Sequence, residues 1–213
     1  MDGERTGGYT TVDVKNRKGE IFELREQLSK FNNEVDYRVQ YKYCFNISHN
    51  LFEIEQLANY IGNRKFNYFL EIGGANGGSL WFYSNLFCSS SAFIRCIEPK
   101  RVEALLFIRD KLEETGKSVS IDQAWSYTKN LCESIPDNTI DLLHIDGSHL
   151  YEDVKIDFEL FYPKVKKGGI ILMHDVISHE GSKKFIGGIG DKYNMIKFVD
   201  KDFGLGIGLI EKQ

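Results

Sequence analysis

The chain has 213 residues, of which 42% are hydrophobic and 27% charged, proportions that exclude a disordered or fibrous protein and fit one folded domain. Its 27 lysines and arginines against 31 aspartates and glutamates give a net charge of −4, which argues against general binding to nucleic acid. No run of about 18 apolar residues is present, and the start lacks the apolar core of a signal peptide. We therefore expect a cytoplasmic domain without a membrane partner.

The first 50 residues predict an N-terminal lead with a helix that belongs to the same domain as residues 51–213. Residues 1–16 have little apolar periodicity, whereas apolar residues recur at helical spacing from residue 21 to 31 and again from 51 to 61. Ser48 and Asn50 are both candidates for the N-cap of the second helix, and Gly62 is expected to end it.

Short apolar runs alternate with helical patterns from residue 68 onward, as in the β-α units of a parallel sheet. The expected strands are residues 68–72, 92–97, 118–121, 140–145 and 169–173. The expected helices are residues 79–87, 102–114, 127–134 and 151–162, the last ended by Pro163. Two closing strands, 196–199 and 205–210, follow an expected glycine-rich loop at 187–190. The pattern predicts an α/β fold: a doubly wound, Rossmann-like, mostly parallel sheet of about seven strands.

A glycine-rich turn connects the first expected strand to the next helix. Gly73, Gly74 and Gly77 permit positive φ and let a ligand approach the backbone, and the helix that starts at Ser79 offers N–H groups to a negatively charged group. Ala75 interrupts the G-x-G-x-x-G pattern of dinucleotide sites, so a ligand without pyrophosphate fits better. A tight turn without a ligand is the alternative interpretation.

Several polar residues beside this turn are candidate cofactor ligands. Glu71, at the carboxyl end of the first strand, is expected to orient an amino group and the N–H groups of the turn. Glu98 ends the second strand, where such folds hold a ribose, although it could instead cap the helix after Pro99. Trp125 and Ser126, which follow the third strand, are candidates for contacts to adenine; for Trp125 a place in the core is equally expected.

Carboxylates and histidines follow the fourth and fifth expected strands, and the doubly wound topology turns them toward the glycine turn. Asp146 and Asp175 would repel each other unless a cation bridges them, so they predict a site for Mg²⁺ or a similar divalent ion. His174 is either a ligand or a support of that site. His149 is the candidate base for a substrate hydroxyl, and His144 is expected in the core or behind the ligands. Helix capping and structural histidines are the alternatives.

With these residues assembled, the chain resembles the class I S-adenosylmethionine-dependent methyltransferases. Within them it is similar to the subgroup of macrolide-sugar O-methyltransferases and cephalosporin-hydroxylase-like proteins. The similarity extends from about residue 50 to 175. It rests on a cofactor motif and on a metal-and-base motif: residues 71–73 with Gly77 and Ser79, and residues 145–149 with Tyr151 and residues 174–175.

This resemblance implies that S-adenosylmethionine is the cofactor, with Asp146 beside it. It also implies that Asp146 and Asp175 hold the divalent ion and that His149 is the general base. Some relatives carry a third acidic or amide ligand beside the second aspartate, whereas here the neighbours of Asp175 are His174 and Val176.

Three functions follow from the sequence. The first is O-methylation of a hydroxyl on a small metabolite or sugar, assisted by a divalent metal. The second is a hydroxylase or oxidoreductase on the same fold, although Ala75 speaks against a nicotinamide cofactor. The third is a non-catalytic binding or assembly protein, in which residues 37–45 and 198–210 are candidate interfaces to a partner or to a second copy of the chain, although packing in the core is the more common use of such residues.

Overall fold

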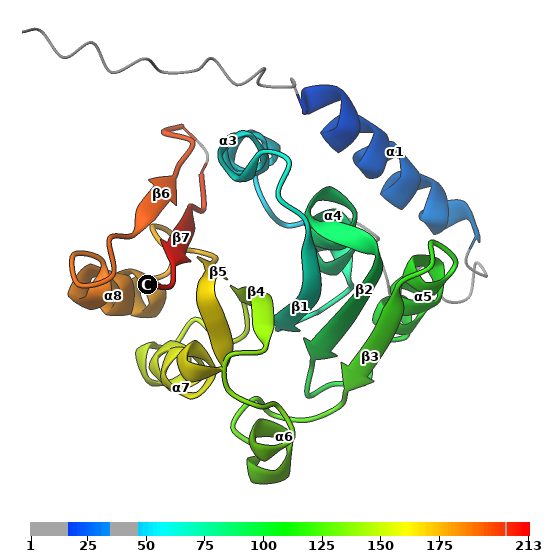
Figure 1. The fold of residues 1–213 in the computed structure, drawn as a ribbon. Helices are drawn as coiled ribbons and strands as arrows, with labels where there is room; N and C mark the ends of the chain where they lie inside the picture. The colour runs from blue at the N-terminus through cyan, green and yellow to red at the C-terminus, as the bar shows by residue number, and fades with distance from the viewer. Residues whose placement is uncertain (1–16, 35–46, 203) are drawn as a thin grey trace, which may run out of the picture.

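The sheet at the centre of the molecule has seven strands in the order β3-β2-β1-β4-β5-β7-β6 (Figure 1). The computed structural model describes residues 17–34, 47–202 and 204–213. The strands in chain order are β1 (Phe66–Ile72), β2 (Cys88–Ile97), β3 (Ser118–Asp122), β4 (Ile140–Ile145), β5 (Val165–Met173), β6 (Ile196–Phe198) and β7 (Ile207–Glu211). The first five are parallel, and β7 is antiparallel to β5 and β6. The predicted α/β fold class is therefore confirmed.

Helices cover both faces of this sheet. One face carries α1 (Lys18–Glu34), α3 (Leu51–Ile61), α4 (Gly78–Phe87) and α5 (Glu103–Glu113). The other carries α6 (Lys129–Glu133), α7 (Tyr151–Phe161) and α8 (Glu180–Ile189), with a 3-10 turn at Tyr162–Lys164 after α7. The strand order reverses between β1 and β4, which is where doubly wound sheets bind ligands.

The N-terminal helix α1 is amphipathic and packs on α4. Its apolar residues at helical spacing, Ile21, Leu24, Leu28 and Phe31, are all buried in the core shared by α3, α4 and α5. The Phe31 ring meets Trp81 of α4 edge-on, with centroids 5.0 Å apart. Residues 37–45, a candidate interface, lie outside the described residues.

Helix α3 begins and ends where its cap residues predict. Asn50, rather than Ser48, is the N-cap, and its side-chain oxygen accepts the N–H groups of Phe52 and Glu53. Gly62 ends the helix with φ of 64°. Since residue 49 directly precedes this cap, the position of α3 fixes that of the segment that enters the site.

Glu53 attaches α3 to the segment that precedes β7. Its carboxylate is fully buried and accepts the backbone N–H groups of Asp200 at 2.9 Å and Gly206 at 3.0 Å. Asn50 adds a bond from its amide to the Asp200 carboxylate at 3.0 Å. These contacts hold α3 beside β6 and β7, at one edge of the sheet.

The prediction of a glycine-rich loop at residues 187–190 is wrong, because residues up to Ile189 belong to α8. Phe185 and Ile186 are buried against the core and hold the helix in place, while Gly187 and Gly188 face solvent. Two glycines cost a helix only about 1 kcal/mol each, which such packing offsets. The helix expected at 127–134 is the shorter α6, and the closing strand expected at 205–210 is β7.

Among the described residues, no helix has the length and apolar character needed to span a membrane.

Candidate functional site

A cavity of about 380 Å³ opens at the carboxyl ends of β1, β4 and β5. Its volume lies within the ~300–1,000 Å³ usual for small-molecule sites. One wall is the glycine turn, with residues 73–76, Gly78 and Ser79. The opposite wall consists of the polar residues after β4 and β5, together with Ser48, His49 and Leu205. The structure therefore brings the two motifs of the sequence to one cavity.

The glycine turn lies directly against the end of β4. Gly73 has φ of 90°, and a Cβ atom there would collide with the carbonyl group of Asp146. The N–H of Asp146 in turn donates to the Ile72 carbonyl at 2.9 Å. Gly78 and Ser79 begin α4, so the N-terminus of that helix faces the cavity and favours an anionic group. Gly77 precedes the helix with φ of 84° and does not line the cavity.

Glu98 is buried and supports the glycine turn from behind. Its two carboxylate oxygens accept the backbone N–H groups of Ala75 and Lys100, both at 3.0 Å. Ala75 lines the cavity, whereas Glu98 does not. The expected contact of Glu98 to a ribose stays a prediction. In the structure, Glu98 stabilises the conformation of the turn.

Glu71 also lies behind the cavity wall. It is fully buried in β1, and its Oε1 contacts Nδ1 of His144, on the neighbouring strand β4, at 2.8 Å. His144 is buried, as expected for a residue behind the ligands. The partner of Glu71 is thus a histidine rather than an N–H group of the turn, and its expected contact to an amino group stays a prediction.

The two residues expected beside adenine lie outside the cavity lining. Trp125 is 55% exposed and stacks on Tyr127, so the alternative of a place in the core is wrong. Ser126 is buried, and its hydroxyl donates to Asp157 of α7. Burial raises the pKa of Asp157 to about 6, and the bond from Ser126 opposes this shift.

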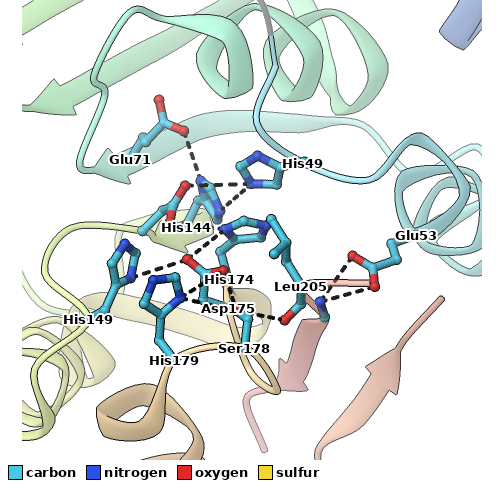
Figure 2. Close-up of polar contacts among 12 residues, drawn as sticks. His49, Glu53, Glu71, His144, His149, His174, Asp175, Ser178, His179 and Leu205 are labelled. Carbon is cyan, nitrogen blue, oxygen red and sulfur yellow. Dashed lines mark hydrogen bonds and ion pairs between the residues drawn. The ribbon is translucent and has the colours of Figure 1, made fainter. Parts of the chain in front are cut away.

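The expected acid and histidine side chains converge on the wall opposite the glycine turn (Figure 2). His174 Nδ1 lies 3.2 Å from Asp146 Oδ1 and 3.4 Å from Asp175 Oδ2. His149 Nδ1 lies 3.3 Å from the same oxygen of Asp175. Asp175 has φ of 57°, and the Ser178 hydroxyl donates to its Oδ1 at 2.6 Å. One imidazole therefore lies between the two carboxylates, and a second contacts one of them.

Sequence reasoning missed two further histidines, His49 and His179. His179 Nδ1 lies 3.2 Å from Asp175 Oδ1, and its ring stacks on His149. His49 stacks on His174, with ring centroids 3.7 Å apart. All five histidines of the chain therefore gather here. The spacing of four residues from Asp175 was a usable signal for His179, but nothing in the local sequence places His49.

The electrostatics of this cluster centre on His174. Burial lowers its pKa, but hydrogen bonds to Asp146 and Asp175 outweigh that effect and raise it to about 9. Burial also opposes ionisation of Asp175, yet its bonds to His174 and Ser178 hold the pKa of this carboxyl well below its usual range. For His49, burial and the neighbouring His174 and His144 lower the pKa. Protonated His174 therefore places a positive charge between the carboxyl groups of Asp146 and Asp175.

A divalent cation supplies the same positive charge between two carboxyl groups. Donor atoms of Asp146, His174 and Asp175 lie within 4.8 Å of one another. The Nε2 atom of His174 is buried and has no hydrogen-bond partner among the described residues. Two carboxylates and one imidazole fit a divalent ion that keeps some of its water ligands.

Known proteins match this chain in sequence and in fold. A family model for a methyltransferase domain matches residues 70–176, half of the chain. An uncharacterized protein of Acanthamoeba polyphaga mimivirus is 34% identical over 128 residues, which cover 57% of each chain. Another, from Sinorhizobium fredii, is 49% identical over 43 residues, 20% of this chain. The chain spans 57% and 5% of the lengths of these two curated relatives.

Two solved structures share the fold at low sequence identity. An O-methyltransferase from Bacillus cereus, in complex with S-adenosylhomocysteine, has a TM-score of 0.58 at 13% identity, covering 95% of this chain and 94% of that one. The methyltransferase MycE of the mycinamycin pathway, in complex with Mg, S-adenosylhomocysteine and mycinamycin VI, has a TM-score of 0.57 at 17% identity, covering 92% and 55%. By its family model and its fold, the chain belongs to the class I S-adenosylmethionine-dependent methyltransferases.

Proposed function

We propose that this chain is an S-adenosylmethionine-dependent O-methyltransferase that acts on a hydroxyl group of a small metabolite or sugar. The observation that carries the proposal is the single cavity in which the glycine turn faces His149, Asp146 and Asp175. A donor bound at the turn and an acceptor bound at the strand ends would meet there, and proximity supplies much of the rate enhancement of such a transfer. The family match favours this function over the oxidoreductase and the non-catalytic protein.

The wall around Gly73, Gly74 and Ala75 is the proposed cofactor site. Its backbone is open to close approach, and the N-terminus of α4 at Gly78 and Ser79 favours the carboxylate of an amino acid moiety. Ala75 and the absence of a complete dinucleotide pattern fit a ligand without pyrophosphate. When bound, S-adenosylmethionine supplies the methyl group.

Asp146, Asp175 and His174 are the proposed ligands of a divalent cation, Mg²⁺ or a similar ion. When bound, such an ion lowers the pKa of a coordinated hydroxyl and orients its oxygen. The chain's own contribution is to hold two carboxyl groups within reach of one ion, with His174 between them.

His149 is the proposed general base. Asp175 Oδ2 lies 3.3 Å from its Nδ1, a contact that orients the ring and leaves Nε2 to accept the proton of the acceptor hydroxyl. The side chain is 37% exposed, so an acceptor can approach it from the open side of the cavity.

Acceptor-dependent release of S-adenosylhomocysteine, measured with hydroxylated sugars and small metabolites, tests the proposal. We expect His149→Ala to lower turnover about 10²–10⁴-fold, because proton removal is lost, while calorimetry shows unchanged cofactor binding. Lys183→Ala, on the exposed face of α8, is the matched control and should retain full turnover. A wild-type chain that binds no S-adenosylmethionine would overturn the function. Full turnover of His149→Ala would remove only the proposed base.

A further inference from the structure

We propose that His49, His144 and Asp146 form a second metal site, one that takes a four-coordinate transition-metal ion of the zinc class. His49 Nε2 lies near His144 Nε2 and Asp146 Oδ2, and the three side chains offer donor atoms within 4.8 Å of one another. The site shares Asp146 with the cation site described above but uses its other carboxylate oxygen, since Oδ1 contacts His174. It goes beyond the proposed methyl transfer and does not depend on it.

The spacing of the donor atoms fits coordination better than direct hydrogen bonding. His49 Nε2 lies 3.5 Å from His144 Nε2 and 3.7 Å from Asp146 Oδ2. Hydrogen bonds between such atoms are usually ~2.7–3.2 Å long, so both distances are too large. Donors of a tetrahedral ion with bonds of about 2.0–2.2 Å lie about 3.3–3.6 Å apart. The two separations from His49 Nε2 are therefore close to those between donor atoms of one tetrahedral ion.

Glu71 gives this site the outer carboxylate that is typical of metal-binding histidines. Its Oε1 lies 2.8 Å from His144 Nδ1, and both side chains are fully buried. Such a contact holds the proton on Nδ1 and turns the lone pair of Nε2 toward the ion. Figure 2 shows His144 between Glu71 on one side and His49 on the other. This gives the buried contact between Glu71 and His144 a role in metal binding.

The surroundings of the site contain buried polar atoms without partners. Among the described residues, His49 Nδ1, Glu71 Oε2 and Tyr83 Oη are buried and make no hydrogen bond. The Tyr83 ring meets the rings of both histidines edge-on, 5.6 Å from His49 and 4.9 Å from His144. Unpartnered polar atoms are costly, and an ion with an ordered water offers partners for them.

The fourth coordination position faces the cavity. His49 and Asp146 line the cavity, whereas His144 lies beneath its wall. Water or an oxygen atom of a bound substrate can therefore complete the site. Imidazole nitrogens favour Zn²⁺, Co²⁺ or Fe²⁺ over Mg²⁺, so this site and the neighbouring cation site should differ in metal preference.

Cobalt titration of the metal-free full-length chain tests the second site, because four-coordinate Co²⁺ absorbs visible light far more strongly than six-coordinate Co²⁺. We expect an intense visible band that one equivalent of Zn²⁺ abolishes. His49→Ala and His144→Ala should weaken Co²⁺ binding at least about 100-fold, and Glu71→Gln about 10–100-fold. Lys183→Ala, on the exposed face of α8, is the control, and circular dichroism checks that each variant is folded.

Asp175→Asn separates the two sites. It should keep the intense cobalt band while Mn²⁺ binding, followed by electron paramagnetic resonance, is lost; His49→Ala should do the reverse. A wild-type chain without the intense band overturns the second site, as does a band that survives in both His49→Ala and His144→Ala. Loss of the band in Asp175→Asn overturns it too, because the ion would then belong to the neighbouring site. Each of these results leaves the proposed methyl transfer standing.

Discussion

Asp157 is a single carboxyl group whose surroundings make stability depend on pH. It is 3% exposed on α7, and burial raises its pKa from the ordinary 3.8 to about 6. The folded state therefore binds its proton more tightly than the unfolded state does. The stabilisation is fully present below pH 3.8 and is lost as the pH rises through about 6.

Asp157→Asn should remove this dependence, because the amide keeps an oxygen for the Ser126 hydroxyl and carries no charge. We expect its free energy of unfolding at pH 8 to exceed that of the wild type by about 1–3 kcal/mol, with little difference at pH 4. Urea unfolding at both pH values measures this, and Glu159→Gln, exposed on the same helix, is the control. Equal pH dependence of Asp157→Asn and the wild type would contradict the raised pKa.

The sequence predicted the position of some site residues but not of others. Asp146, His149 and Asp175 follow strands that the apolar runs identify, so the parallel topology alone brings them together. His49 meets His144 across 95 positions of the chain, through a contact that only the packing of α3 creates. For Trp125, residue type alone did not predict burial, because an aromatic ring can stack on another at the surface as well as pack in a core.

At the scale of elements, α3 depends on one buried carboxylate. Glu53→Ala removes the buried acceptor of the Asp200 and Gly206 N–H groups and the hydrogen bonds that it makes. We expect the free energy of unfolding to fall by about 2–4 kcal/mol. Glu53→Gln, which keeps one oxygen, should lose less. Urea denaturation measures both, with the exposed Asn59→Ala of the same helix as control; a loss no greater than that of the control would contradict this role.

The ends of helices and strands were predicted correctly where nearby residues, such as helix caps, determine the backbone conformation. Asn50 and Gly62 cap α3, and β4 spans the predicted residues 140–145. The prediction failed at α8, where glycine composition indicated a loop but the burial of Phe185 and Ile186 maintains a helix. Tertiary packing, which a local pattern does not contain, decides such cases.

At the scale of the whole molecule, we propose that α1 and the sheet form one cooperative domain. Leu28 is 1% exposed and belongs to the core beneath α3 and α4, whereas Phe22, on the opposite face of α1, is 49% exposed. Leu28→Ala should lower the stability of the entire chain by about 2–4 kcal/mol, in a single transition. Phe22→Ala should change it little. Thermal unfolding followed by both circular dichroism and tryptophan fluorescence measures this; separate transitions would contradict one domain.

The central claim is that the turn after β1 and the side chains after β4 and β5 form one site for a methyl donor and a divalent ion. A crystal structure of the chain with S-adenosylhomocysteine and Mn²⁺ tests it most directly. The account predicts the nucleoside against Gly73, Gly74 and Ala75, and an anomalous manganese peak between Asp146 and Asp175. A ligand bound elsewhere, or manganese absent from these carboxylates at saturating concentration, would contradict it.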